Sequence, residues 1–356
     1  MKITRINKVT FFIGTLGNGG AERVISILTW CLAEKGIPVE IVLYYDSEPF
    51  YEIHPAVKIT YVERETGSRN LLRNLVWLRR YFIRNADMVI SFLAQFNMLA
   101  LAACFATGIP IIVADRNDPR HMPRKSFLRV ARNLLYHLAD TVVVQTQHNK
   151  AYFSTALQKK CKIIYNPVDL QDKKGLALRT EKKYRIVSAA RLMKQKNQLM
   201  LIEAFAQIKK EFPDYSLTIY GEGPFREVLE NRISELGLGD SVMLPGSVQN
   251  VFECIADADL FVLSSDFEGM PNALIEAMCL GLPVISTRVS GATDLIQNGK
   301  NGLLSDVGDT DQLADNMRRM LADAELRANC AQNALEMNDL LQVDSIVRQW
   351  IACFKI

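Results

Sequence analysis

The segment LFVLSSDFEGMPNALIEAMCLGLPVIST, residues 260–287, decides the fold because it joins two buried strands through a loop and a helix. Residues 260–265 and 282–287 are short, mostly apolar runs, which are typical of strands covered on both faces. The Gly/Pro loop between them leads into a helix that carries Glu276. A strand, a helix and a second strand in this order predict one unit of a parallel sheet.

The same alternation of short apolar runs with longer amphipathic stretches covers the rest of the chain. A charged segment without an apolar period, residues 168–183, divides it. We predict an α/β protein with two Rossmann-like, doubly wound domains at 1–169 and 170–338, and a C-terminal helix within 339–356 that packs back on the N-terminal domain. The expected strands are residues 9–14, 39–44, 88–93, 109–114, 141–146, 162–167, 185–190, 216–221, 241–246, 260–265 and 282–287.

The composition is that of an ordinary globular protein. A length of 356 residues suits two domains, and 49% hydrophobic with 23% charged residues excludes disordered, collagen-like and coiled-coil classes. The seven cysteines form no C-x-x-C pair, and the opening residues MKITRINK hold no apolar signal segment. We expect a protein of the reducing cytoplasm without a cysteine-built zinc site.

No charged residue occurs between Asp87 and Asp115, a stretch that is long enough to span a bilayer. Two interpretations are open: the stretch inserts into a membrane, or it forms a strand, a helix and a strand of the protein core. Gly108 and Pro110 would break a continuous spanning helix, so we favour the core interpretation.

The net charge of +3 hides an asymmetry between the two halves of the chain. Residues 1–170 carry 22 Lys and Arg against 13 Asp and Glu, a charge of +9, and the remainder carries −6. The basic amphipathic segments 69–85 and 120–137 are typical either of packed helices or of helices that bind a membrane surface. Because both lie in the same half, we predict that the N-terminal domain binds an anionic membrane. No RNA-type aromatic signature or helix-turn-helix occurs, so no nucleic acid partner is expected.

Several glycines, at positions 14, 17, 19 and 20, follow the first strand and lead into a helix. They would let backbone amides approach an anion at the helix N-terminus, although a purely structural turn uses the same residue type. The spacing departs from the dinucleotide fingerprint G-x-G-x-x-G, and the second strand lacks a clean acidic end for a ribose. An oxidoreductase is therefore disfavoured.

Two basic residues, Arg191 and Lys196, follow the strand at 185–190 and precede a helix. Their positions suit a clamp on a diphosphate. The alternative is a basic helix start on the surface. Basic residues at a helix N-terminus oppose the helix dipole, so a bound anion explains them better.

Two carboxylates, Glu268 and Glu276, lie on the loop and the helix that follow residues 260–265. They could accept hydrogen bonds from the hydroxyls of a sugar and a ribose, beside the unpaired backbone N–H groups of a helix start. The plainer alternatives are a loop acid and a solvated helix face. Glu276 is flanked by Ala, Ile and Met, and a carboxylate in so apolar a helix needs partners.

Two acidic pairs, Asp257 with Asp259 and Asp309 with Asp311, raise the question of a metal site. The first pair precedes a buried strand, where Asp residues end a turn, and the second is placed as a helix N-cap. We expect no metal and no cofactor, because the basic clamp and backbone amides already supply the countercharge that a divalent ion would provide.

Four motifs occur in a fixed order along the chain. They are Gly-Gly-Ala-Glu at 19–22, Arg-Leu-x-x-x-Lys at 191–196, Ile-Tyr-Gly-Glu-Gly-Pro at 219–224 and Glu-x7-Glu at 268–276. Over essentially the whole chain they resemble the retaining glycosyltransferases of family 4, which have the GT-B fold of two Rossmann-like domains facing across a cleft. The chain is most similar to bacterial enzymes that extend lipid-linked, capsular or O-antigen saccharides, including N-acetylgalactosaminyltransferases.

The resemblance implies a role for each matching residue that binds the nucleotide. Arg191 and Lys196 would hold the donor diphosphate, and Glu276 would bind the ribose. Gly19 and Gly20 would form the glycine loop beside the phosphates.

The resemblance also implies which residues surround the donor sugar. Glu268 would contact it together with the loop residues Gly269, Met270, Pro271 and Asn272. Where the family often carries a histidine near the reacting sugar, this chain has Asp115-Arg116-Asn117-Asp118, and Arg116 is the substitute that we expect. The residues expected to act in catalysis are Arg191, Lys196, Glu268 and Arg116.

The function implied by the resemblance is the retaining, metal-independent transfer of a hexose or N-acetylhexosamine. UDP is the expected donor nucleotide, and a lipid-linked saccharide at the inner face of the cell membrane is the expected acceptor. A nucleotide-sugar epimerase of the same fold would convert the donor without an acceptor. A non-catalytic protein would bind nucleotide-sugar as the partner of another glycosyltransferase. The complete clamp and both glutamates favour the transferase.

Overall fold

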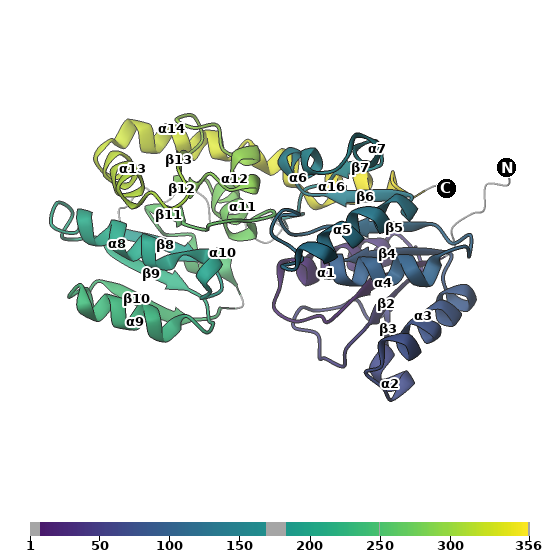
Figure 1. Cartoon of the computed structure of the whole chain (residues 1–356). Helices are drawn as coiled ribbons and strands as arrows, with labels where there is room; N and C mark the ends of the chain where they lie inside the picture. Colours follow the sequence, from purple (N-terminus) through teal and green to yellow (C-terminus); the bar gives the residue numbers. More distant parts are fainter. Residues whose placement is uncertain (1–7, 169–182, 249, 355–356) are drawn as a thin grey trace. The chain divides into compact units, whose positions relative to one another are not determined.

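The computed structural model describes residues 8–168, 183–248 and 250–354. The chain divides into two compact units, one of Met1–Pro167 with Val343–Ile356 and one of Val168–Gln342. Each is built on a parallel sheet with helices on both faces, so the predicted fold class of two Rossmann-like domains is confirmed (Figure 1). Most of the linker expected at 168–183 lies outside the described residues.

The first unit contains a seven-stranded sheet with β4 at its centre. Its strands are β1 Val9–Ile13, β2 Val39–Leu43, β3 Lys58–Tyr61, β4 Met88–Phe92, β5 Ile111–Ala114, β6 Thr141–Val144 and β7 Cys161–Ile163. They are parallel throughout and lie in the order β3-β2-β1-β4-β5-β6-β7. Every residue of β1, β2 and β4 is buried, which is why these strands read as mostly apolar runs in the sequence.

Helices cover both faces of this sheet. They are α1 Gly20–Glu34, α2 Val62–Thr66, α3 Leu71–Asn85, α4 Ala94–Cys104, α5 Ser126–Leu135, the 3-10 helix η1 Tyr136–Leu138, α6 Gln147–Tyr152, α7 Thr155–Gln158 and α16 Val343–Ile351. α1 and α16 pack on one face of the sheet, whereas α3 and α4 pack on the other.

The uncharged stretch between Asp87 and Asp115 forms β4, α4 and β5 in the middle of the first unit. Its strands are fully buried, so the core interpretation is confirmed. Among the described residues, no helix is both long enough and apolar enough to cross a membrane.

The second unit contains a six-stranded parallel sheet in the order β10-β9-β8-β11-β12-β13. Its strands are β8 Arg185–Ala189, β9 Ser216–Tyr220, β10 Val242–Gly246, β11 Leu260–Leu263, β12 Val284–Thr287 and β13 Leu303–Ser305. Its helices are the 3-10 helix η2 Lys194–Lys196, α8 Gln198–Ile208, α9 Arg226–Glu235, α10 Val251–Ile255, α11 Asn272–Cys279, α12 Ser290–Leu295, α13 Thr310–Ala322, α14 Ala324–Ala334 and α15 Met337–Leu341.

Two strands of the structure, β3 and β13, were not predicted from the apolar runs of the sequence. β3 is an edge strand with only one fully buried residue, so its sequence KITY does not read as an apolar run. β13 is also an edge strand, and its three residues are too few for a periodic signal.

The last described helix, α16, belongs to the first unit although the second unit precedes it in the chain. Its Trp350 is fully buried and stacks on Phe92 of β4, with ring centroids 5.7 Å apart and an interplanar angle of 19°. This aromatic pair therefore ties the end of the chain to the centre of the first sheet.

Replacing Trp350 by alanine should lower the free energy of unfolding by about 3–5 kcal/mol, because the change opens a large cavity beside Phe92. Trp30→Ala is the matched control, since the Trp30 ring is only half-buried and meets His54 edge-on. Urea unfolding of both variants measures the difference. Equal losses would contradict the anchoring role of α16.

Candidate functional site

The two motifs of the second unit follow neighbouring strands. β8 and β11 are adjacent and parallel, and the strand order of the sheet changes direction between them (Figure 1). Open α/β sheets bind ligands beyond the carboxyl ends of the strands at such a switch point. Arg191 and Lys196 follow β8 and Glu268 follows β11, so the topology brings the two loops together.

Lys196 and Glu268 form an ion pair between these two loops. The Nζ atom of Lys196 lies 2.5 Å from Oε1 of Glu268. Ser265, at the end of β11, donates a hydrogen bond from Oγ to the same Oε1 at 2.7 Å. The Glu268 side chain is buried, so this residue is a paired carboxylate and not a solvated loop acid.

Further hydrogen bonds fasten the β8 loop to the β11 loop. The side-chain amide of Gln195 donates to the carbonyl of Phe267 at 2.7 Å, and the amide of Asp266 donates to the carbonyl of Gln195 at 2.8 Å. Asn197 donates from Nδ2 to Asp266 Oδ1 at 2.8 Å, and its left-handed backbone (φ 45°) begins α8. The position of Lys196 is therefore fixed by its neighbours on both sides.

Arg191 is exposed at the start of the β8 loop, and a second loop holds it in place. A Cβ atom at Gly221 would lie 1.9 Å from the carbonyl oxygen of Ala190, and one at Gly223 would lie 2.2 Å from that of Leu192. Both glycines also have positive φ values, 143° and 159°. The Gly-x-Gly of the 219–224 motif thus permits backbone contact with the loop that carries Arg191.

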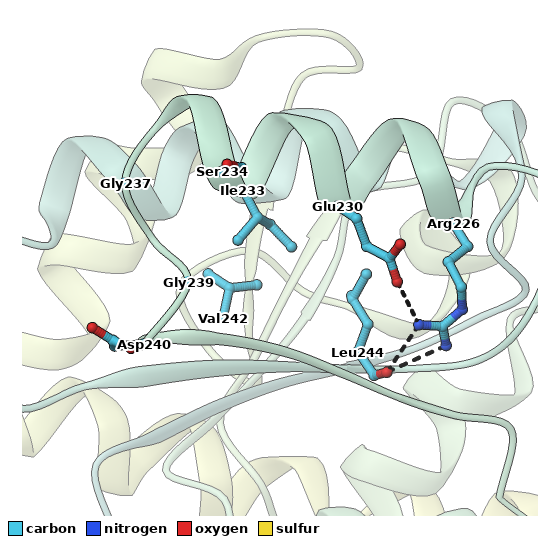
Figure 2. Close-up of a pocket in the computed structure, with 9 residues that line it drawn as sticks. All are labelled: Arg226, Glu230, Ile233, Ser234, Gly237, Gly239, Asp240, Val242 and Leu244. Carbon is cyan, nitrogen blue, oxygen red and sulfur yellow. Dashed lines mark hydrogen bonds and ion pairs between the residues drawn. The ribbon is translucent and has the colours of Figure 1, made fainter.

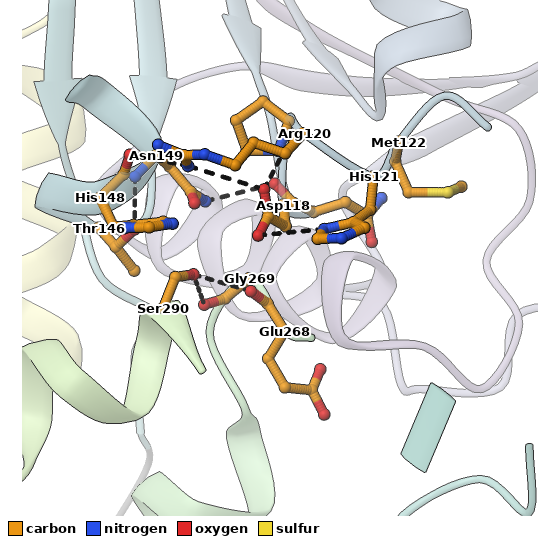
Figure 3. Close-up of polar contacts among 12 residues, drawn as sticks. Asp118, Arg120, His121, Met122, Thr146, His148, Asn149, Glu268, Gly269 and Ser290 are labelled. Atoms are coloured by element: carbon orange, nitrogen blue, oxygen red, sulfur yellow. Dashed lines mark hydrogen bonds and ion pairs between the residues drawn. The ribbon is translucent and has the colours of Figure 1, made fainter. Parts of the chain in front are cut away.

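The loop from Glu268 to Pro271 rests on the start of α12 (Figure 3). Ser290 donates from Oγ to the carbonyl of Glu268 at 2.8 Å, and the carbonyl of Gly269 lies 3.4 Å from the same oxygen. A Cβ atom at Gly291 would lie 2.4 Å from the Gly269 carbonyl oxygen and 2.5 Å from Cδ of Pro271. Neither Ser290 nor Gly291 was among the residues expected at the site from the sequence. The sequence signal that could have identified them is the Ser-Gly pair that follows β12, the strand next to β11.

The remaining residues expected at the donor lie on the same loop and on α11. Met270 and Pro271 are buried, and Asn272 begins the helix. Glu276, in the second turn of α11, is only 2% exposed, so the alternative of a solvated helix face is wrong.

The glycine loop of the first unit occupies the corresponding switch point of the other sheet, between β1 and β4. A Cβ atom at Gly14 would lie 2.3 Å from the ring of Phe96, so the loop passes closely over α4. Gly19 is the N-cap residue of α1 and Gly20 is its first residue, as the sequence predicts. Glu22 also lies in this first turn, so a carboxylate already accompanies the helix start.

Arg116 lies inside the first unit, only 7% exposed. Its Nη1 donates to Oδ1 of Asn166 at 2.9 Å, and its guanidinium lies 4.9 Å from the Phe92 ring centroid and 5.4 Å from that of Trp350. Burial lowers the pKa of this guanidinium to about 9. The expected contact of Arg116 with a donor sugar stays a prediction.

A second group, Asp118 with His121, lies on the loop after β5, and neither residue was expected to have a role at the site (Figure 3). The buried carboxylate of Asp118 accepts a hydrogen bond from the backbone amide of Arg120 at 2.8 Å. Its other oxygen lies 3.4 Å from Nδ1 of His121, whose ring is half-exposed. This arrangement orients an imidazole at the carboxyl end of the first sheet.

The two acidic pairs have structural partners. Asp259 accepts hydrogen bonds from the backbone amides of Lys183 and Arg185, and Asp257 forms an ion pair with the Arg185 side chain. Asp309 caps α13 by accepting from the amide of Gln312, as predicted. Nowhere in the described ranges do three or more His, Cys, Asp or Glu side chains form a group that could hold a metal ion.

One open pocket of about 480 Å³ lies between α9 and the edge strand β10 of the second unit (Figure 2). Arg226 in its wall donates hydrogen bonds to Glu230 and to the carbonyl of Leu244, so this guanidinium is already engaged. None of the residues expected to bind the donor lines this pocket.

Two family models cover nearly the whole chain. The model of "Glycosyltransferase Family 4" matches residues 18–172, and that of "Glycosyl transferases group 1" matches residues 171–337.

Two relatives from Campylobacter jejuni match over most of their length. One is the N-acetylgalactosamine-N,N'-diacetylbacillosaminyl-diphospho-undecaprenol 4-alpha-N-acetylgalactosaminyltransferase, 33% identical over 90% of this chain and 92% of that enzyme. The other, named as an alpha-1,4-N-acetyl-D-galactosaminyltransferase acting on a diNAcBac-PP-undecaprenol saccharide, is 28% identical over 97% of both chains.

Among solved structures, the Anabaena protein Alr3699/HepE in complex with UDP and glucose superimposes with a TM-score of 0.81. The sequences are 22% identical, and the match covers 98% of this chain and 99% of that one. The GT-B fold that the resemblance implied is confirmed.

Gly291→Ala should disorder the 268–271 loop, because the added methyl group would collide with backbone atoms of Gly269. We expect a fall in UDP affinity or in transferase turnover of at least tenfold with the fold retained, measured by calorimetry and product assay. Gly239→Ala is the control, since that site is open and has an ordinary φ. Normal binding and turnover in the Gly291 variant would contradict a role for α12 in supporting this loop.

Proposed function

The chain belongs to glycosyltransferase family 4, and from this premise we propose that it transfers an N-acetylhexosamine or hexose from a UDP-linked donor with retention of configuration. The two Campylobacter relatives, whose names specify N-acetylgalactosamine, favour an N-acetylhexosamine. The observation that carries the proposal is the Lys196–Glu268 ion pair at the switch point of the second sheet, next to the exposed Arg191.

In this proposal the donor diphosphate lies against Arg191 and Lys196. Glu268 balances the charge of Lys196 in the absence of donor, and its second carboxylate oxygen accepts a hydrogen bond from a hydroxyl of the donor sugar. Glu276 binds the ribose, and Gly269, Met270, Pro271 and Asn272 shape the wall beside the sugar. Contact of Gly19 and Gly20 with a phosphate stays a prediction of the family resemblance.

The chemical step breaks the bond between the anomeric carbon and the oxygen of the diphosphate. Negative charge develops on the leaving group, and fixed cations placed there stabilise the transition state. The oxygen of the acceptor hydroxyl forms the new bond to the anomeric carbon on the face that the leaving group vacates. An oxygen of the leaving phosphate accepts the proton of that hydroxyl. Because the two basic side chains supply the countercharge, we propose that transfer needs no metal ion and no cofactor.

The proposed acceptor is a lipid-linked saccharide in bacterial glycan assembly, as the names of both Campylobacter relatives state for those enzymes. Such an acceptor is confined to a membrane. We therefore propose that this protein works in the cytoplasm at the inner face of the cell membrane, held there by its basic first unit.

The epimerase alternative and the transferase differ in their need for acceptor. We would incubate the protein with a panel of nucleotide sugars, with and without an undecaprenyl-diphosphate-linked saccharide, and analyse products by mass spectrometry. The proposal predicts acceptor-dependent addition of one sugar. Conversion of the donor alone would support the epimerase, and no reaction with any donor would favour the non-catalytic partner.

Lys196→Ala should lower turnover by a factor on the order of 100 or more, the usual effect of losing one fixed charge that stabilises a transition state. Lys194→Ala is a matched control, because Lys194 lies in the same 3-10 turn and is exposed. Steady-state assays measure the turnover of both variants. Near-normal turnover in the Lys196 variant would remove this residue from the mechanism.

The two glutamates should respond differently to neutralisation. Glu276→Gln should weaken binding of UDP, whereas Glu268→Gln should leave UDP affinity unchanged or raise it, because Lys196 loses its internal counterion. The Glu268 variant should instead lose turnover with the sugar donor. Calorimetry with UDP alone measures the first effect, and equal losses in both variants would contradict this division of roles.

A further inference from the structure

Helix α5 of the first unit is oriented with its apolar side toward solvent. Phe127, Val130, Leu134 and Leu138 are spaced by three and four residues, so they form one stripe along α5 and η1. Their side chains are 63%, 61%, 67% and 44% exposed. Burial of such side chains is ordinarily favourable, so an exposed stripe indicates a surface that another phase or molecule covers.

The inner side of α5 is held by a charged residue instead. Arg132 is the fully buried residue of this helix, and it donates hydrogen bonds to the carbonyls of Met122 and Pro119 at 2.6 and 3.1 Å. Its guanidinium also lies 3.6 Å from the buried Asp115. These polar contacts and Leu135, which packs against the core of the first unit, hold the inner side of α5. The exposed apolar stripe takes no part in these contacts.

The surroundings of the stripe carry one sign of charge. Arg124 and Lys125 are exposed directly before α5, and the segment 119–139 contains no Asp or Glu. α4 packs against both α5 and α3, and α3 also lacks acidic residues (Figure 1). On α3, Arg73, Arg80 and Arg84 are exposed and have no recorded carboxylate partner in the described part of the chain.

Three arginines of the two basic segments predicted to bind a membrane make contacts within the first unit. Arg79 donates to the carbonyls of Ala103 and Phe105 at 3.1 and 2.6 Å and so caps the end of α4. Arg69 forms an ion pair with Glu63, and Arg132 is buried. These three arginines stabilise the unit itself, which restricts the basic surface to the remaining residues.

We propose that α5 lies in the interfacial region of an anionic lipid bilayer, with Phe127, Val130, Leu134 and Leu138 inserted among the acyl chains. Arg124 and Lys125 contact the lipid phosphates, and the exposed arginines of α3 add long-range attraction. An apolar face flanked by cations is the combination that binds such interfaces. The proposal deepens the proposed function and rests on it for its purpose, because a lipid-borne acceptor requires the enzyme at a membrane.

The central experiment measures binding of the full chain to vesicles of phosphatidylcholine containing about one-third phosphatidylglycerol. The test variant replaces Phe127, Val130 and Leu134 by serine, positions so exposed that folding should be unaffected. The control variant replaces Val228, Met243 and Val307 of the second unit by serine, which are also exposed apolar residues. We expect the test variant to bind at least tenfold more weakly and the control to bind like the parent.

Salt separates the apolar contribution from the electrostatic one. Arg124→Gln with Lys125→Gln should weaken binding on the order of tenfold or more at low salt and have little effect near 1 M salt, where charges are screened within about 3 Å. The serine variant should remain weaker at every salt concentration, because apolar insertion is not screened. As a direct readout, Phe127→Trp should show a blue shift of emission on adding vesicles.

Three results would overturn the proposal. The first is no binding of the parent to anionic vesicles at low salt, and the second is equal binding of the parent and the serine variant. The third is concentration-dependent self-association of the parent that the serine substitutions abolish, which would assign the stripe to a protein interface. Transfer to a soluble acceptor tests the proposed function separately: its failure with vesicle binding intact would contradict the function and leave the docking surface supported.

Discussion

The ion pair between Lys196 and Glu268 is the interaction on which the candidate site depends. It joins the loops that follow β8 and β11 across the switch point of the second sheet, with Ser265 donating to the same carboxylate. A lysine at this position without a counterion would be a partly buried, unbalanced charge, which is costly. The pairing therefore keeps a cation in place at the edge where parallel sheets bind ligands, and the proposed function assigns this cation to an incoming diphosphate.

Close backbone contact holds this arrangement in place. Gly221 and Gly223 let the β9 loop touch the loop of Arg191, and Gly291 lets α12 touch the loop of Glu268, where any Cβ atom would collide. The loops are thus fixed by close packing against one another and against the start of α12. In the first unit, stacking of Trp350 on Phe92 has a similar effect on the end of the chain, and it also encloses Arg116.

The fold and the positions of the candidate-site loops after β8 and β11 were predictable from the sequence, because buried parallel strands read as mostly apolar runs and the loops after them carry the polar motifs. The edge strands β3 and β13 were not predicted, because half-exposed or very short strands leave no periodic signal in the sequence.

The supporting roles of Ser290 and Gly291 were not predictable from the sequence either. Their partners are backbone atoms of a loop that is distant in the chain, so no spacing of side chains reveals them. Helix α5 likewise turns its apolar side to solvent because Arg132 on its other side contacts the buried Asp115, a contact that periodicity alone does not show.

The central claim is that the donor diphosphate binds at the switch point between β8 and β11. Hydrogen exchange with and without UDP tests it most directly, because amides in loops that hold a ligand open less often. The account predicts that UDP slows exchange in residues 191–197 and 266–272 of the second unit. Unchanged exchange in both loops, with protection instead around the pocket between α9 and β10, would contradict the account.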